Sequence, residues 1–429
     1  MINEKVRPIS SALVANTKIP KFFKVRQNFF TNGIKVEEIP SVVSKKIGRP
    51  EIKRRITPNA NIAITVGSRG ISNIQVLVKS IVDYVKECGA NPFIVPSMGS
   101  HGKATSEGQL QILKSYGITE EYLECPIRSS MEVVKIGTLD DGRDVFIDKE
   151  AYNSDGIIVF CRIKPHTAFR GPYESGIMKM LAIGLGNQHG AEACHATGFG
   201  LMGENIELFG KEILNKAPIL FSVAVIENAF DQTEKIYSVE AEKIVEIEPP
   251  LLKEAYSLMG RLYEPECDVL IVDKIGKNYS GDGMDPNITG TFSTPYADGG
   301  IKSKRVCVLD LSEETHGNGV GIGMADITTQ RAVDKLDLDS MYANVITSTV
   351  LGGVKIPMIM ESDKEAIQLA IHTLTDVDTN NLKIIKITDS LNVFEIMMSE
   401  YFYDKVQNNK NYTILSEPKE LQFDEHGNF

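Results

Sequence analysis

The fold is decided by residues 61–95, NIAITVGSRGISNIQVLVKSIVDYVKECGANPFIV. Asn61–Val66 is an apolar run of the length expected for a buried strand, and residues 74–88 repeat apolar side chains with the period of an amphipathic helix. Gly89 is typical of a helix end, and residues 92–95 form a second short apolar run. A strand, a helix and a strand in this order predict a βαβ unit with parallel strands.

The same pattern continues along the chain in two blocks. Residues 156–163 and 219–226 predict further strands of the first block, and a second α/β pattern begins with a strand at 268–272. The acidic segment 239–250, which ends in two prolines, lies between the blocks and predicts a link or a domain edge.

The length of the chain favours two domains, because a single hydrophobic core stops growing near ~250–300 residues and this chain has 429. We therefore predict an α/β fold class with two α/β domains, residues 1–250 and 251–429, mainly parallel sheets and an active-site cleft between the domains. The polar tail after Asn408 is expected to be loosely held.

The composition of the chain argues against a membrane protein, a secreted protein and a nucleic-acid-binding protein. No run of ~18 uncharged apolar residues and no secretory signal at the N-terminus are present, so we expect a cytoplasmic protein with no membrane partner. The net charge of −11 argues against nucleic acid as a partner. Six cysteines without a C-x-x-C pair favour reduced thiols over a disulfide framework or a zinc knuckle.

Two loops at the predicted carboxyl ends of strands carry candidate binding residues. Gly67, Ser68 and Arg69 lie between a strand and a helix, where backbone N–H groups, a hydroxyl and a guanidinium can hold a phosphate or a carboxylate. His101 lies between glycines that allow close approach of a ligand. We expect these loops to converge with that of His166, since ligands of open α/β sheets bind at this edge. The alternatives are an ordinary turn with a surface arginine and an exposed loop histidine.

A third segment combines a proline-held histidine with a lysine. His166 follows Pro165 at the end of a predicted strand, and a rigidly aimed imidazole suits acid–base catalysis. Lys179 has apolar neighbours, so it either extends its amine to water or uses the amine covalently with a lowered pKa. His195 follows on a predicted helix; because His189 is six residues earlier, a helical zinc pair is not supported.

The second block offers one weaker candidate. Lys277 and Asn278 follow a predicted strand and can present a cation and amides to a substrate in a cleft between domains. The alternative is a solvated turn.

Together these motifs resemble the lactate racemase family. The resemblance rests on the Pro165-His166 pair, on Ser175-Gly176-x-x-Lys179 and on the sixteen-residue interval from Lys179 to His195, and it extends over both predicted domains. It implies an isomerase that inverts C2 of a small-molecule 2-hydroxy acid by reversible hydride transfer to a nickel-pincer nucleotide. Proteins that synthesise this cofactor are then candidate partners.

The resemblance also implies a role for each site residue. Lys179 corresponds to the covalent tether of the cofactor and His195 to the nickel ligand, while His101 and His166 correspond to the two catalytic histidines. Arg69, with Ser68 and Gly67, corresponds to the loop that binds cofactor and substrate. The N-terminal domain is then expected to carry the cofactor and the catalytic histidines, and the C-terminal domain to close the cleft and contribute Lys277 and Asn278 as substrate contacts.

Departures from lactate-type members concern the substrate. Three more residues separate His166 from Lys179 than in those members, and the loop at 277–287 is richer in polar groups. We therefore expect a substrate larger or more polar than lactate, such as a sugar acid or a hydroxydicarboxylate. Two other functions stay open: a non-catalytic homologue that binds the cofactor or a ligand, and a zinc-dependent hydrolase or dehydratase.

Overall fold

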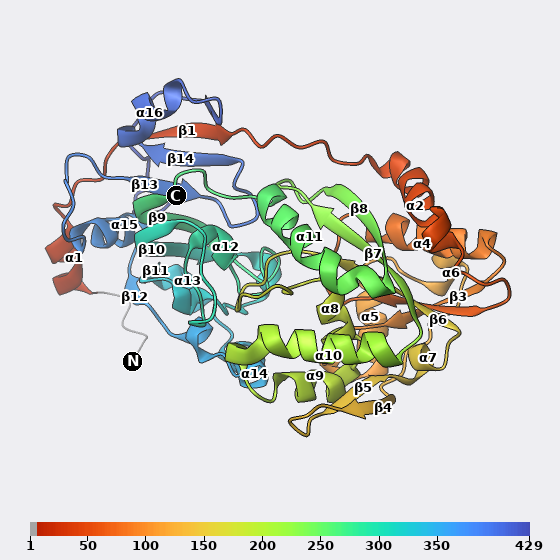
Figure 1. Cartoon of the computed structure of the whole chain (residues 1–429). Helices are drawn as coiled ribbons and strands as arrows, with labels where there is room; N and C mark the ends of the chain where they lie inside the picture. Colours follow the sequence, from red (N-terminus) through yellow and green to blue (C-terminus); the bar gives the residue numbers. More distant parts are fainter. Residues whose placement is uncertain (1–6) are drawn as a thin grey trace. The chain divides into compact units, whose positions relative to one another are not determined.

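The computed structural model describes residues 7–429, which divide into two compact units (Figure 1). The central unit is Thr31–Met259, and the terminal unit combines the chain up to Phe30 with Gly260–Phe429. The division differs from the predicted one in two respects. Residues 7–30 group with the C-terminal half, and the predicted boundary after residue 250 falls inside helix α11 (Ile244–Leu258).

Residues 239–250 form neither the predicted link nor the predicted domain edge, because α11 contains both prolines of that segment and the edge of the central unit falls after Met259. Pro249 has no N–H to donate to the carbonyl group of Val245, one helical turn earlier. The hydroxyl group of Tyr173 donates to this carbonyl oxygen instead, at 2.7 Å. A side chain from elsewhere in the central unit thus satisfies the acceptor that proline leaves open, and the helix continues.

The central unit contains the predicted βαβ unit. Its sheet has the strand order β3-β2-β6-β7-β8. Strands β2 (Asn61–Val66), β3 (Asn91–Pro96), β6 (Gly156–Arg162) and β7 (Ile219–Glu227) are parallel, with α4 (Ile74–Glu87) crossing from β2 to β3. The last strand, β8, pairs antiparallel with β7.

Helices cover both faces of this sheet, which explains the continuous apolar sequence of β6. Val159 and Cys161 belong to a core that includes residues of α8, α10 and α11, whereas Ile158 and Phe160 belong to the core on the side of α2 and α4. The other elements of the central unit are α2 (Ile39–Ile47), α3 (Pro50–Lys53), α5 (Ser106–Ser115), α6 (Glu120–Leu123), β4 (Val133–Thr138), β5 (Asp144–Asp148), α7 (Lys149–Tyr152), α8 (Ile177–Lys179), α9 (Asn187–His195), α10 (Met202–Lys216) and β8 (Thr233–Glu240).

The terminal unit has a sheet with the strand order β12-β11-β10-β9-β13-β14-β1-β15. The first five strands are parallel and the last three pair antiparallel, so the predicted α/β class with mainly parallel sheets is confirmed. The elements are α1 (Pro8–Val14), β1 (Phe22–Gln27), β9 (Glu266–Ile275), α12 (Pro286–Thr289), β10 (Lys302–Leu311), β11 (Ile327–Thr329), α13 (Gln330–Asp334), α14 (Leu338–Ser348), β12 (Met358–Met360), α15 (Asp363–His372), β13 (Ile384–Ile387), β14 (Glu395–Ser399), α16 (Tyr403–Gln407) and β15 (Tyr412–Ile414).

The tail after Asn408 is not loosely held, contrary to the prediction. Strand β15 pairs with β1, and the N–H of Phe22 donates to the carbonyl oxygen of Lys419 at 2.8 Å. Polar composition misled the prediction because an edge strand needs backbone pairing rather than apolar side chains. Among the helices of residues 7–429 we find no candidate membrane span.

Candidate functional site

The loops after β2 and β3 meet at the carboxyl edge of the central sheet. Ser68 follows β2, His101 follows β3, and the Ser68 hydroxyl group is hydrogen-bonded to Nδ1 of His101. The hydroxyl group of Tyr116 donates to the carbonyl oxygen of Ser68 at 2.8 Å, which fixes the first loop. The second loop is held by the N–H of Gly99, which donates to the carbonyl oxygen of Gly184 at 3.2 Å.

His166 lies in the loop after β6 and is fixed by its backbone and by its ring. Its N–H donates to the buried carboxylate of Glu174 at 2.7 Å, and the ring packs on Phe169 with 4.3 Å between centroids. Its Nδ1 accepts a hydrogen bond from the backbone N–H of Ala168 at 3.0 Å. Nδ1 therefore carries a lone pair in this geometry, and the proton of the neutral ring is on Nε2.

A buried carboxyl group holds the start of the helix that carries Lys179. Glu248 is 1 % exposed and accepts the backbone N–H of Met178 at 2.8 Å, with a second hydrogen bond from the N–H of the preceding residue. Burial raises the pKa of Glu248 to about 8. A Cβ atom on Gly176 would lie 2.1 Å from Oε1 of Glu248, so a glycine is required there.

His195 is the last residue of α9, and its ring orientation suits a metal ligand. Its Nδ1 lies 2.6 Å from the carbonyl oxygen of Ala191, which can only accept, so Nδ1 carries the proton and Nε2 carries the lone pair of the neutral ring. The end of the helix is held by Asn205, whose side-chain amide donates to the carbonyl oxygen of Cys194 at 2.8 Å.

A broken helix connects Lys179 to His195. Met180–Gly184 forms a π-helical turn, and Asn187 begins α9 with a positive φ of 49°. The Asn187 side chain donates to Oδ2 of buried Asp148 at 2.9 Å. Burial raises the pKa of Asp148 to about 6. This polar contact fixes the change of direction between the two helices.

Charges link these residues electrostatically. Loss of hydration, followed by the positive charges of Arg69 and Lys179, lowers the pKa of His101 to about 4, although the residue as a whole keeps contact with solvent. Burial and then Lys179 also lower the pKa of His166, to well below its ordinary value. The pKa of His195 is lowered by burial too. All three imidazoles are therefore neutral at pH 7, in a cationic environment that suits an anion.

The structure thus places seven of the nine predicted site residues in the central unit. Gly67, Ser68, Arg69, His101, His166, Lys179 and His195 lie on its loops and helices, and contacts or charge interactions join all of them except Gly67. A Cβ atom on Gly67 would lie 3.0 Å from Cε of Met180, next to Lys179, so this glycine packs on the same segment.

The other two predicted residues, Lys277 and Asn278, lie in the terminal unit. Lys277 Nζ donates to the carbonyl oxygen of Gly281 at 2.6 Å, and Asn278 Oδ1 accepts from the Ser312 hydroxyl group at 2.6 Å. These contacts shape the loop after β9. A role in substrate binding stays a prediction.

Four buried polar residues of the site were not predicted from the sequence: Glu174, Glu248, Asn205 and Asp148. Each holds a backbone or side-chain group that positions one of the predicted residues. Glu248 immediately precedes Pro249 and Pro250. Because we interpreted the two prolines as a link, we did not recognise Glu248 as a residue that supports the site. For the other three, no local spacing distinguishes them from surface residues.

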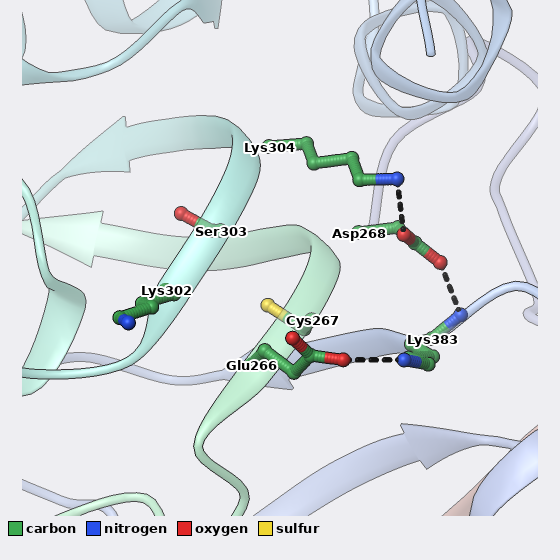
Figure 2. A pocket seen from close by; sticks show the side chains of 7 residues that line it. All are labelled: Glu266, Cys267, Asp268, Lys302, Ser303, Lys304 and Lys383. Atoms are coloured by element: carbon green, nitrogen blue, oxygen red, sulfur yellow. Dashed lines mark hydrogen bonds and ion pairs between the residues drawn. The ribbon is translucent and has the colours of Figure 1, made fainter. Parts of the chain in front are cut away.

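The terminal unit also contains a hollow of about 280 Å³, lined by Glu266, Cys267, Asp268, Lys302, Ser303, Lys304 and Lys383 (Figure 2). It lies at the amino ends of β9, β10 and β13, the edge opposite to that used by ligands in α/β sheets. Its charges pair with one another, as in Lys304 with Asp268 at 3.3 Å and Lys383 with Glu266 at 2.5 Å (Figure 2). We do not regard it as the functional site.

The fold and the site define an α/β protein that gathers three neutral imidazoles and a lysine at the carboxyl edge of a parallel sheet. Residues 20–220 match the family model of the lactate racemase N-terminal domain, so this part of the chain is similar to that family. Among solved structures, the lactate racemase apoprotein from Thermoanaerobacterium thermosaccharolyticum is similar, with 16 % identity, a TM-score of 0.48, and coverage of 86 % of this chain and 88 % of that chain. No curated protein matches the sequence.

Proposed function

We propose that this protein is a racemase or epimerase that inverts C2 of a 2-hydroxy acid, with a nickel-pincer nucleotide bound to Lys179 and His195. The match of residues 20–220 to the lactate racemase N-terminal domain supports the coarser part of this proposal, an isomerase of the racemase or epimerase type acting on a small molecule. The observation that carries it is the placement of Lys179 and His195 on two helices fixed to each other, close to His101 and His166.

The residues present fit such a cofactor. Nε2 of His195 carries a lone pair, which a nickel ligand requires, and a backbone carbonyl group orients the ring through Nδ1. Lys179 lies beside three imidazoles and provides the amine for a covalent bond. When bound, the nickel-pincer nucleotide supplies a reversible hydride acceptor for the hydrogen on C2.

The chain itself supplies the acid–base chemistry and the binding of the acid. Neutral histidines at pH 7 can accept or donate a hydrogen bond at the C2 oxygen, and one of them can take the hydroxyl proton. Arg69 and the Gly67-Ser68 backbone provide a guanidinium and N–H groups for the carboxylate of the substrate or for a phosphate of the cofactor. Lys277 and Asn278 are proposed as further substrate contacts.

The test has two measurements on protein produced together with the proteins that synthesise the cofactor. Intact mass and nickel content are expected to show an adduct on wild type that is absent from Lys179→Ala and present in Lys114→Ala, a matched exposed lysine of α5. Interconversion of stereoisomers is then followed for lactate, malate, 2-hydroxyglutarate and gluconate. We expect faster turnover of the larger acids, and a clear preference for lactate would contradict the substrate assignment.

The same measurements separate the alternatives. A protein without an adduct on Lys179 that binds zinc would favour a hydrolase or dehydratase. Among residues 7–429, no group of three or more His, Cys, Asp or Glu side chains is arranged to hold a metal ion. An adduct on Lys179 without stereochemical exchange would favour a non-catalytic homologue.

A further inference from the structure

The two proposed catalytic histidines differ in what their Nδ1 atoms contact. Nδ1 of His166 accepts the backbone N–H of Ala168 at 3.0 Å, and a backbone amide can only donate. Nδ1 of His101 contacts the hydroxyl group of Ser68, which can rotate to donate or to accept. The ring of His166 is therefore restricted to one tautomer, and the ring of His101 is not.

The restriction determines what His166 can do. To accept a proton on Nε2, the ring would first have to carry its own proton on Nδ1 instead of Nε2. The N–H of Nδ1 would then face the backbone N–H of Ala168, and two donors would oppose each other. The protonated ring has the same conflict, because it carries a proton on both nitrogens. The fixed turn makes this conflict costly, since Glu174 accepts the N–H of His166 and Arg170 donates to its carbonyl oxygen at 2.7 Å.

We propose that His166 acts as a neutral hydrogen-bond donor through Nε2–H toward the C2 oxygen of the substrate, and that His101 is the histidine that accepts the hydroxyl proton. A neutral imidazole can polarise a carbonyl oxygen without becoming an imidazolium ion. When Nδ1 of His101 donates to Ser68, Nε2 carries the lone pair that a base needs. This inference rests on the proposed function for the identity of the substrate oxygen.

The first test needs neither cofactor nor activity. In protein labelled with ¹⁵N-histidine, the seven histidines give ring signals that report the protonation of each nitrogen, and the His166→Gln variant assigns the signal of His166. We expect an unprotonated Nδ1 and a protonated Nε2 at pH 7. A proton on Nδ1 of His166 at this pH, in either the neutral or the charged ring, would overturn the inference.

The second test uses the loaded enzyme. Gln can donate a hydrogen bond but cannot act as a base, so His166→Gln is expected to stay within about tenfold of the wild-type kcat, while His166→Leu loses on the order of 10²–10³-fold. His101→Gln is expected to lose on the order of 10²–10⁴-fold. Equal losses in His166→Gln and His166→Leu would refute the donor role. If wild type itself exchanges no stereoisomers, the proposed function fails, and the first test still decides separately whether the His166 ring is restricted to donating through Nε2.

Discussion

The buried carboxyl group of Glu248 allows a quantitative test of how the helix of Lys179 is held. The Glu248→Gln variant keeps the shape of the side chain and one acceptor oxygen for the N–H of Met178, but it removes the titratable group. In the folded protein burial raises the pKa of Glu248 from 4.5 to about 8. The acid is therefore easier to ionise in the unfolded chain, and its contribution to stability is present below pH 4.5 and is lost as the pH rises through 8.

The size of this loss follows from the pKa difference. At 1.36 kcal/mol for each pKa unit, the pKa difference corresponds to about 5 kcal/mol at most between pH 4.5 and 8. Two other titratable groups interact with Glu248, the thiol of Cys161 and the phenol of Tyr173, and both pKa values are raised above their ordinary 9.0 and 10.0. They do not titrate between pH 5 and 8, and Asp148 and the histidines of the central unit are present in both proteins, so the difference between wild type and Glu248→Gln in this window belongs to Glu248.

Hydrogen exchange of the Met178 amide measures this effect locally. A chain with two compact units is not expected to unfold in one step, so a global unfolding midpoint is less informative. We expect protection of this amide in wild type, relative to Glu248→Gln, to fall by up to about tenfold for each pH unit between 5 and 8. The amides of β10, which belongs to the terminal unit, serve as an internal control with a constant ratio. A ratio for Met178 that does not change with pH would refute this account of Glu248.

Two further predictions concern the same site. Gly176→Ala places Cβ 2.1 Å from the carboxyl oxygen of Glu248 and is expected to destabilise the central unit by about 1–3 kcal/mol. Its control is Gly190→Ala, where the nearest atom is 3.5 Å away and the helix should gain up to about 1 kcal/mol; hydrogen exchange of the slowest amides of the central unit checks both, and equal protection in the two variants would contradict the prediction. Arg69→Gln removes a positive charge that lowers the pKa of His101, so an NMR titration of His101 should give a higher pKa than in wild type, and an unchanged value would show that Arg69 does not act on this ring.

The sequence predicts the elements of this fold better than their grouping. Apolar runs and helical periods located β2, α4 and β3 within one or two residues, because burial on both faces of a sheet imposes such a pattern. The unit boundary and the tail depend on pairing between distant segments, as in β1 with β15. No local pattern encodes that pairing.

In the candidate site, too, the sequence predicts some residues and not others. Reactive side chains are conspicuous at loops after strands, so His101 and His166 could be predicted from residue type and position, and Lys179 could be predicted from its apolar neighbours. The residues that hold them, such as Glu248 and Asn205, act through single hydrogen bonds to the backbone of another element. Their role becomes visible only when the packing is known.

The sixteen-residue interval shows why the missed residues matter. In a straight α-helix, Lys179 and His195 would lie about 24 Å apart, too far for one small cofactor to join them. In the structure burial and then the charge of Lys179 lower the pKa of His195, so the two side chains are close enough to interact. The π-helical turn at Met180–Gly184 and the contact of Asn187 with Asp148 supply the necessary change of direction. The proposed cofactor site therefore depends on a buried aspartate, distant in sequence, that holds the break between the two helices.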